Sequence, residues 1–73
     1  MLIELYKNHQ HCTLSVQYDL FGRVTVFQIA TRKLKNKTST WQRKVCFDEE
    51  KEANLYLCDL EFKYRSRGYI YAS

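Results

Sequence analysis

The sequence predicts a small α+β domain in which an antiparallel sheet of three to five strands packs against one long α-helix. Three observations predict it: alternating apolar and polar residues in the first half, a turn motif between two such stretches, and an apolar stripe at helical spacing near the C-terminus. The chain has 73 residues, of which 45% are hydrophobic and 27% charged, with two Gly and no Pro. That composition is typical of one folded unit, so we assign residues 1–73 to a single domain.

The first hairpin is predicted from two strands and the turn between them. Residues 12–18 alternate in a way typical of a half-buried strand, with Cys12, Leu14, Val16 and Tyr18 on one face. A turn follows at Asp19-Leu20-Phe21-Gly22, because Asp can bond the backbone ahead of it and Gly can adopt a positive φ. Residues 23–32 return as a strand rich in β-branched and aromatic side chains. Both faces of this strand carry apolar groups, which favours a position inside the sheet.

The rest of the sheet is predicted from shorter signals. Residues 33–40 are polar and basic and predict a loop. A third strand is expected over residues 41–47, where Trp41, Arg43, Val45 and Phe47 alternate with polar residues. Short additional strands are expected over residues 2–6 and 69–71.

The covering helix is predicted from about Asp48 to Arg67. One stripe has the helical spacing of a buried face: Ala53, Tyr56, Leu57, Leu60 and Tyr64. A second stripe is expected to widen that buried side: Leu55, Cys58 and Phe62. Asp48 is a suitable N-cap, acidic residues follow it, basic residues occupy the last turn, and Gly68 is suited to end the helix.

Size and motif content argue against catalysis. A chain this short buries only about 60% of the surface that its unfolded form exposes, which leaves no room for an enclosed reaction chamber. No nucleophile elbow, carboxylate pair or Gly-rich phosphate loop is found, so we expect neither an enzyme nor a small-molecule substrate or cofactor. His9, His11 and Cys12 lack a second ligand pair at zinc-site spacing, so no metal site is expected.

Cysteine usage and hydropathy indicate the compartment. The three cysteines are an odd number at wide spacings without a Cys-x-x-Cys motif, and they suggest no disulfide framework. No signal-peptide pattern and no apolar stretch of membrane-spanning length occurs. We therefore expect a cytoplasmic protein without a membrane partner.

The charge is unevenly distributed. The net charge is +4, the sequence pI is about 9.1, and no acidic residue occurs between Asp19 and Asp48. That interval holds seven of the twelve basic residues: Arg23, Arg32, Lys33, Lys35, Lys37, Arg43 and Lys44. A basic surface with interleaved aromatic residues is typical of phosphate binding. The alternative is a solvated ribbon whose lysines serve solubility or prevent edge pairing.

Three short motifs occur in a recognisable order: Asp19-Leu20-Phe21-Gly22, then Phe47-Asp48-Glu49-Glu50-Lys51-Glu52-Ala53, then Lys63-Tyr64-Arg65-Ser66-Arg67-Gly68-Tyr69. In order and spacing they resemble the WGR domain family, bacterial domains also found in poly(ADP-ribose) polymerases, across nearly the whole chain. The family's Trp-Gly-Arg strand falls on Ala30-Thr31-Arg32, where only the Arg is kept. The resemblance implies a small bacterial stand-alone WGR-like domain that grips a DNA backbone, often at a break or end.

Charge and resemblance together define the expected nucleic-acid-binding residues: Asn8, Arg32, Lys33, Lys35, Lys37, Arg43, Lys63, Arg67 and Tyr69. Arg32 is the first choice because a guanidinium presents a fork of donors that matches phosphate oxygens. The alternative for Arg32 is an ion pair with a helix carboxylate.

Three other residues also have structural alternatives. Asn8 is suited either to phosphate contact or to a turn, and Tyr69 either to the binding surface or to stapling the helix end to the sheet. Trp41 is suited to stacking on a base, but as the single Trp of a small core we expect it to pack under the helix.

The expected function is binding of a nucleic-acid backbone, double-stranded DNA or its ends rather than RNA, with little sequence preference. If about four or five phosphates are contacted, log K falls with log salt at a slope of roughly −4. The alternative is a protein–protein interaction module or accessory subunit that keeps the fold without DNA binding. The lost Trp and Gly favour it, and an acidic helix facing a basic hairpin would suit a protein partner or a homodimer.

Overall fold

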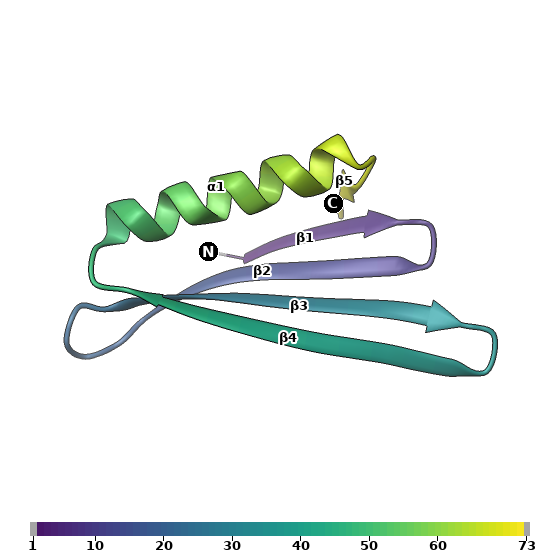
Figure 1. Cartoon of the computed structure of the whole chain (residues 1–73), viewed down its shortest axis with the longest axis horizontal. Helices are drawn as coiled ribbons and strands as arrows, with labels where there is room; N and C mark the ends of the chain where they lie inside the picture. Colours follow the sequence, from purple (N-terminus) through teal and green to yellow (C-terminus); the bar gives the residue numbers. More distant parts are fainter. Residues whose placement is uncertain (1, 73) are drawn as a thin grey trace.

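The computed structural model describes residues 2–72 and shows an antiparallel five-stranded sheet with one helix along one face (Figure 1). The elements are β1 (Leu2–Lys7), β2 (Gln10–Tyr18), β3 (Val24–Leu34), β4 (Lys37–Phe47), α1 (Glu50–Ser66) and β5 (Ile70–Tyr71). The strand order is β4-β3-β2-β1-β5. The predicted α+β class, the interior position of β3 and both short terminal strands are confirmed.

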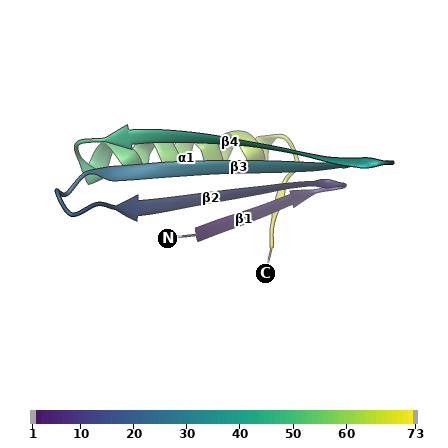
Figure 2. The same cartoon turned by 90° about the horizontal axis from the view of Figure 1, so that it is seen from below.

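Alternation along the strands gives the sheet a helix face and an open face. The buried core lies between the helix face and α1: Leu5, Cys12, Leu14, Val16, Val24, Val26, Ala53, Leu57, Tyr64 and Tyr69. Tyr56 and Leu60 pack half-buried against this core, so the predicted helical stripe is confirmed. Figure 2 shows α1 behind the sheet and, among the described residues, no element in front of its open face.

The turn between β2 and β3 forms as the sequence predicts. The Asp19 Oδ1 atom accepts hydrogen bonds from the backbone N–H of Phe21 at 2.9 Å and of Arg23 at 2.8 Å. Gly22 has a φ of 82°, which favours glycine. Leu20 and Phe21 point out of the turn and are almost fully exposed.

The predicted loop over residues 33–40 is wrong. Strand β3 continues to Leu34, β4 begins at Lys37, and the turn consists of Lys35 and Asn36 alone. The segment is polar because both of its faces meet solvent, not because its backbone is irregular. Thr38 and Thr40 are β-branched and suit an extended ribbon.

The β3–β4 ribbon projects past the end of α1 because its strands are longer than the helix. Seventeen helical residues span about 26 Å, whereas eleven strand residues span about 36 Å. The first turn of α1 lies near the β2–β3 turn, so the excess length extends at the other end (Figure 1). Near the β3–β4 turn, the face of β3 and β4 that is turned toward α1 elsewhere is therefore left without helical cover.

The helix ends differ in how well they are predicted. Asp48 is not the N-cap: α1 starts at Glu50, Glu49 occupies the cap with an extended backbone and no side-chain cap hydrogen bond, and Asp48 Oδ1 lies 3.8 Å from Arg23 Nε. Gly68 ends the helix with a φ of 95°. The Tyr69 N–H donates to the Tyr64 carbonyl and the Gly68 N–H to the Arg65 carbonyl, which is the Schellman pattern.

The second predicted stripe is not buried. Leu55, Cys58 and Phe62 are exposed. Leu55 and Phe62 each lie two residues from a core residue, Leu57 and Tyr64, which places them on nearly the opposite side of α1. A single sheet layer covers only one side of the helix. The spacing of Leu55, Cys58 and Phe62 therefore shows that they share a face of α1, but not that this face is buried. Within residues 2–72, no helix has the length and apolar character needed to cross a membrane.

Candidate functional site

A groove lies where α1 ends and the uncovered part of β3 and β4 begins. Its volume is about 360 Å³, and its lining residues are Gln10, His11, Ala30, Thr31, Arg32, Ser39, Trp41, Tyr64, Arg67 and Tyr69. No acidic residue is among them. The groove therefore combines two guanidinium groups, an indole, an imidazole and several hydroxyl and amide groups, with no carboxylate in its lining.

The two arginines of the groove come from different elements. Arg32 lies on the helix face of β3, opposite Ser39, and Arg67 is the C-cap residue of α1. Within residues 2–72 the ion pairs are Arg23 with Asp48 and Lys63 with Asp59, so neither groove arginine pairs with a carboxylate there. The alternative of an Arg32–helix carboxylate pair is thus not what the structure contains. Both guanidinium groups are available to an anion.

Trp41 lies on the groove floor rather than in the core. It pairs with Ala30 in the β3–β4 register, and half of its surface is exposed. The expectation that it packs under the helix is wrong: α1 packs against the end of β4 that carries Phe47, whose ring contacts Tyr56. The helix-side neighbours of Trp41, Val45 and Phe47, are half-buried instead. An accessible indole beside a small Ala side chain is the arrangement that a stacking ligand requires.

Two tyrosines form the wall at the helix end. Tyr69 is buried and packs edge-on against Tyr64 with ring centroids 4.9 Å apart, and its hydroxyl donates to Gln10 Oε1. Tyr64 accepts a hydrogen bond of 2.6 Å from Gln28 Nε2. Tyr69 therefore staples the helix end to the sheet, as its structural alternative proposed, while its ring borders the groove.

These tyrosines carry no charge near neutral pH. Burial, followed by the neighbouring Cys12 thiol, raises the pKa of Tyr64 to about 12. Burial also raises the pKa of Tyr69. Because both phenols stay protonated, nothing in the wall offsets the positive charge of the arginines.

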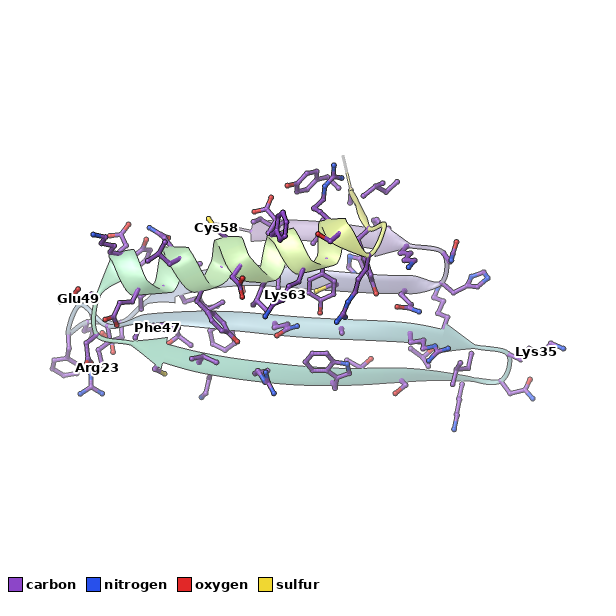
Figure 3. The ribbon with its side chains drawn as sticks, turned by 45° about the horizontal axis from the view of Figure 1, so that its top comes forward. Arg23, Lys35, Phe47, Glu49, Cys58 and Lys63 are labelled. Atoms are coloured by element: carbon purple, nitrogen blue, oxygen red, sulfur yellow. The ribbon has the colours of Figure 1, made fainter. Side chains whose placement is uncertain are left out.

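The structure gathers three of the predicted binding residues in the groove: Arg32, Arg67 and Tyr69. Lys37 and Arg43 lie on β4 and share the helix face with Trp41 without lining the groove. Lys35 lies in the turn at the far tip of the ribbon (Figure 3). Lys35, Lys37 and Arg43 add positive charge along the β3–β4 ribbon, whose residues form the floor of the groove.

Other predicted residues lie elsewhere. Lys33 pairs with Thr38 on the open face, and Lys63 forms a 3.0 Å ion pair with Asp59 within α1. Asn8 has a φ of 53° in the β1–β2 turn, which agrees with its interpretation as a turn residue. Arg23 lies at the opposite end of the molecule from Lys35 (Figure 3), so the basic interval of the sequence does not form one patch.

The sequence does not indicate that Gln10 or Ser39 belongs to the site, and for Trp41 it favours core packing over the stacking alternative that the structure supports. A loop over residues 33–40 contains no strand pairing, so the sequence-based prediction cannot set Ser39 beside Arg32, where the β3–β4 register places it. The signal that could have indicated the site is element length. Where two paired strands are longer than the helix that covers them, one end of the strands is left without helical cover.

No protein-family model matches the chain, and neither the curated proteins nor the solved structures contain a match. Within residues 2–72 no group of three or more His, Cys, Asp or Glu side chains is arranged to hold a metal ion. The resemblance to WGR domains therefore rests on the three sequence motifs.

Proposed function

We propose that this domain binds the phosphate backbone of nucleic acid, duplex DNA or its ends, through the groove between α1 and the β3–β4 ribbon, as a WGR-like module. One observation carries the proposal: Arg32 and Arg67 line a groove with a half-exposed Trp41 and no carboxylate. An arginine without an ionic partner, close to a second one, is suited to bind a polyanion.

The chemistry of the groove favours backbone contact over base readout. Each guanidinium offers parallel N–H donors that fit two phosphate oxygens. Lys35 and Lys37 on the same ribbon add attraction that depends on salt but not on sequence. Trp41 offers a stacking surface to an unpaired base or a duplex end, worth about 1–3 kcal/mol per base.

The sequence motifs support the same proposal independently. Arg32 occupies the position of the Arg that the resemblance assigns to the Trp-Gly-Arg strand, and it is also a groove residue. Trp41, on the neighbouring strand, supplies an indole that the motif position itself lacks. A ligand gripped by Arg32 would therefore still meet an aromatic ring.

Fluorescence anisotropy with labelled duplexes tests the proposal. We would use duplexes of about 20 base pairs, one blunt and one nicked with a 5′-phosphate, at about 50 and 200 mM salt. The unmodified chain is expected to bind both, more weakly at high salt. The double variant Arg32→Ala/Arg67→Ala is expected to bind at least about tenfold more weakly and to lower the salt slope by about 2, from one counterion-releasing contact per arginine.

Arg23→Ala is the matched control, because it removes an exposed arginine at the opposite end of the sheet. Its affinity is expected to stay within about twofold of the parent. Equal losses for Arg23→Ala and the groove variants would show that net charge, not the groove, binds DNA. Absence of binding by the unmodified chain at low salt would overturn the proposal.

A further inference from the structure

The solvent side of α1 carries an apolar stripe that the fold leaves uncovered. Leu55 is 63% exposed and Phe62 71% exposed, and the Cys58 side chain lies between them, also exposed. Figure 3 shows the Cys58 side chain at the edge of α1 remote from β3 and β4. An exposed Leu alone is ordinary, but here the apolar side chains share one face of one helix.

This stripe contains both a projecting side chain, Phe62, and a depression in the surface of α1. Glu50, Lys51, Asn54, Leu55 and Cys58 line a shallow depression on the N-terminal half of α1. Four of them have the spacing i, i+3, i+4, i+7, which is the four-residue hole that receives a side chain from a facing helix. Phe62, one turn beyond Cys58, is an aromatic side chain of the kind that fills such a hole.

Symmetry makes the projection and the recess complementary. The hole is centred between Asn54 and Leu55, and Phe62 lies about as far beyond Cys58 as that centre lies before it. If two α1 helices pack antiparallel about a two-fold axis near Cys58, each Phe62 faces the hole of the other helix. A two-fold contact needs this kind of self-complementary surface.

The charges along α1 also suit an antiparallel copy. Its first turn carries Glu50 and Glu52, and its last turn carries Lys63 and Arg65. In an antiparallel pair the acidic end of each helix lies beside the basic end of the other, whereas a parallel pair would align like charges. The macrodipoles of the two helices also oppose each other in that arrangement.

We propose that this chain forms a symmetric dimer in which the two α1 helices pack antiparallel, with Phe62 of each copy in the depression formed by Lys51, Asn54, Leu55 and Cys58 of the other. The occupant of the stripe is thus a second copy of the chain. Because the interface is only one helix wide, we expect a dissociation constant of the dimer in the micromolar range. The dimer does not depend on nucleic-acid binding.

Sedimentation equilibrium over about 1 to 300 µM measures this directly. The weight-average mass is expected to rise from the 8.8 kDa monomer towards twice that value. Phe62→Ser, which removes an exposed side chain and leaves the core intact, is expected to weaken dimerisation at least about tenfold. Leu20→Ser is the control, because it removes an even more exposed apolar side chain, that of the β2–β3 turn, and it is expected to leave the mass curve unchanged.

Cross-linking then tests the geometry. At the usual 8–10 Å between packed helices, an axis near Cys58 brings the two Cys58 Cα atoms within the disulfide range of about 4.4–6.8 Å. In a Cys46→Ser chain, diamide takes the two thiol hydrogens, and a covalent dimer is expected within minutes. The Cys58→Ser chain, which keeps the exposed Cys46, is expected to stay uncross-linked.

A chain that remains monomeric at 300 µM would overturn the proposal. A dimer that survives Phe62→Ser, or that cross-links through Cys46 but not Cys58, would show that the copies meet through another surface. Circular dichroism of each variant confirms that the fold is retained.

Discussion

At the scale of single residues, the helix face of β3 changes character along its length. Val24 and Val26 lie in the core, Gln28 is buried and bonded to Tyr64, and Arg32 reaches solvent. This gradient follows the cover provided by α1. The basic character of Arg32 could be predicted from the sequence, but its proximity to Arg67 could not, because it depends on where a helix and a ribbon end relative to each other.

Tyr64 gives a pH-dependent prediction. Its pKa rises to about 12 on folding, above the ordinary value of 10, so the folded chain keeps a proton that the unfolded chain releases. The resulting stabilisation is present below pH 10 and is lost as the pH rises from about 10 to about 12, by on the order of 2 kcal/mol. Urea unfolding at a series of alkaline pH values checks it. Tyr64→Phe is expected to flatten this fall, and an unchanged fall in that variant would contradict the prediction.

Asp19 gives a prediction about the β2–β3 turn. Its Oδ1 atom is the acceptor of two backbone hydrogen bonds. Asp19→Ala is expected to lower the free energy of unfolding by about 1–2 kcal/mol, measured by urea titration. Asp19→Asn keeps an oxygen acceptor and is expected to cost less than half as much. Equal costs for the two variants would mean that charge, not the turn geometry, stabilises this turn.

At the scale of elements, local signals predict what local chemistry determines. The Asp19–Gly22 turn, the alternating strands, the core stripe of α1 and the Gly68 stop follow from side-chain spacing and backbone freedom. The predictions that failed depend on tertiary cover: residues 33–40 are strand, Trp41 is exposed, and Leu55 and Phe62 face solvent. Periodicity reports which residues share a face, whereas the number of layers decides whether that face is buried.

The end of α1 gives a prediction at this scale. Gly68 has a φ of 95°, and its Schellman hydrogen bonds set the direction from α1 into Tyr69 and β5. Gly68→Ala is expected to lower the free energy of unfolding by about 1–2 kcal/mol, because an L side chain is strained at this φ. Crowding contributes little, since the nearest atom to an added Cβ is Lys7 Cε at 3.7 Å. Gly68→Asn, which tolerates positive φ better, is expected to recover part of the loss in the same urea titration.

At the scale of the whole molecule, the two proposed surfaces lie on different sides of one short helix. The groove uses the C-cap of α1 and the sheet beneath it, whereas the dimer uses the solvent side of α1. The two share no residue. An antiparallel dimer would therefore present two grooves, and binding of one duplex by both would add avidity.

The separation of the two surfaces can be measured with a pair of variants. Arg32→Ala/Arg67→Ala is expected to lose duplex binding in anisotropy and to keep the dimer in sedimentation, because both arginines lie away from the stripe. Phe62→Ser is expected to do the reverse: it becomes monomeric and keeps its affinity for a duplex too short to reach both grooves. On a duplex long enough to span two grooves, the same variant is expected to bind at least about tenfold more weakly than the parent, since avidity is lost. If Phe62→Ser instead weakened binding to the short duplex equally, the groove and the dimer interface would be one functional surface rather than two.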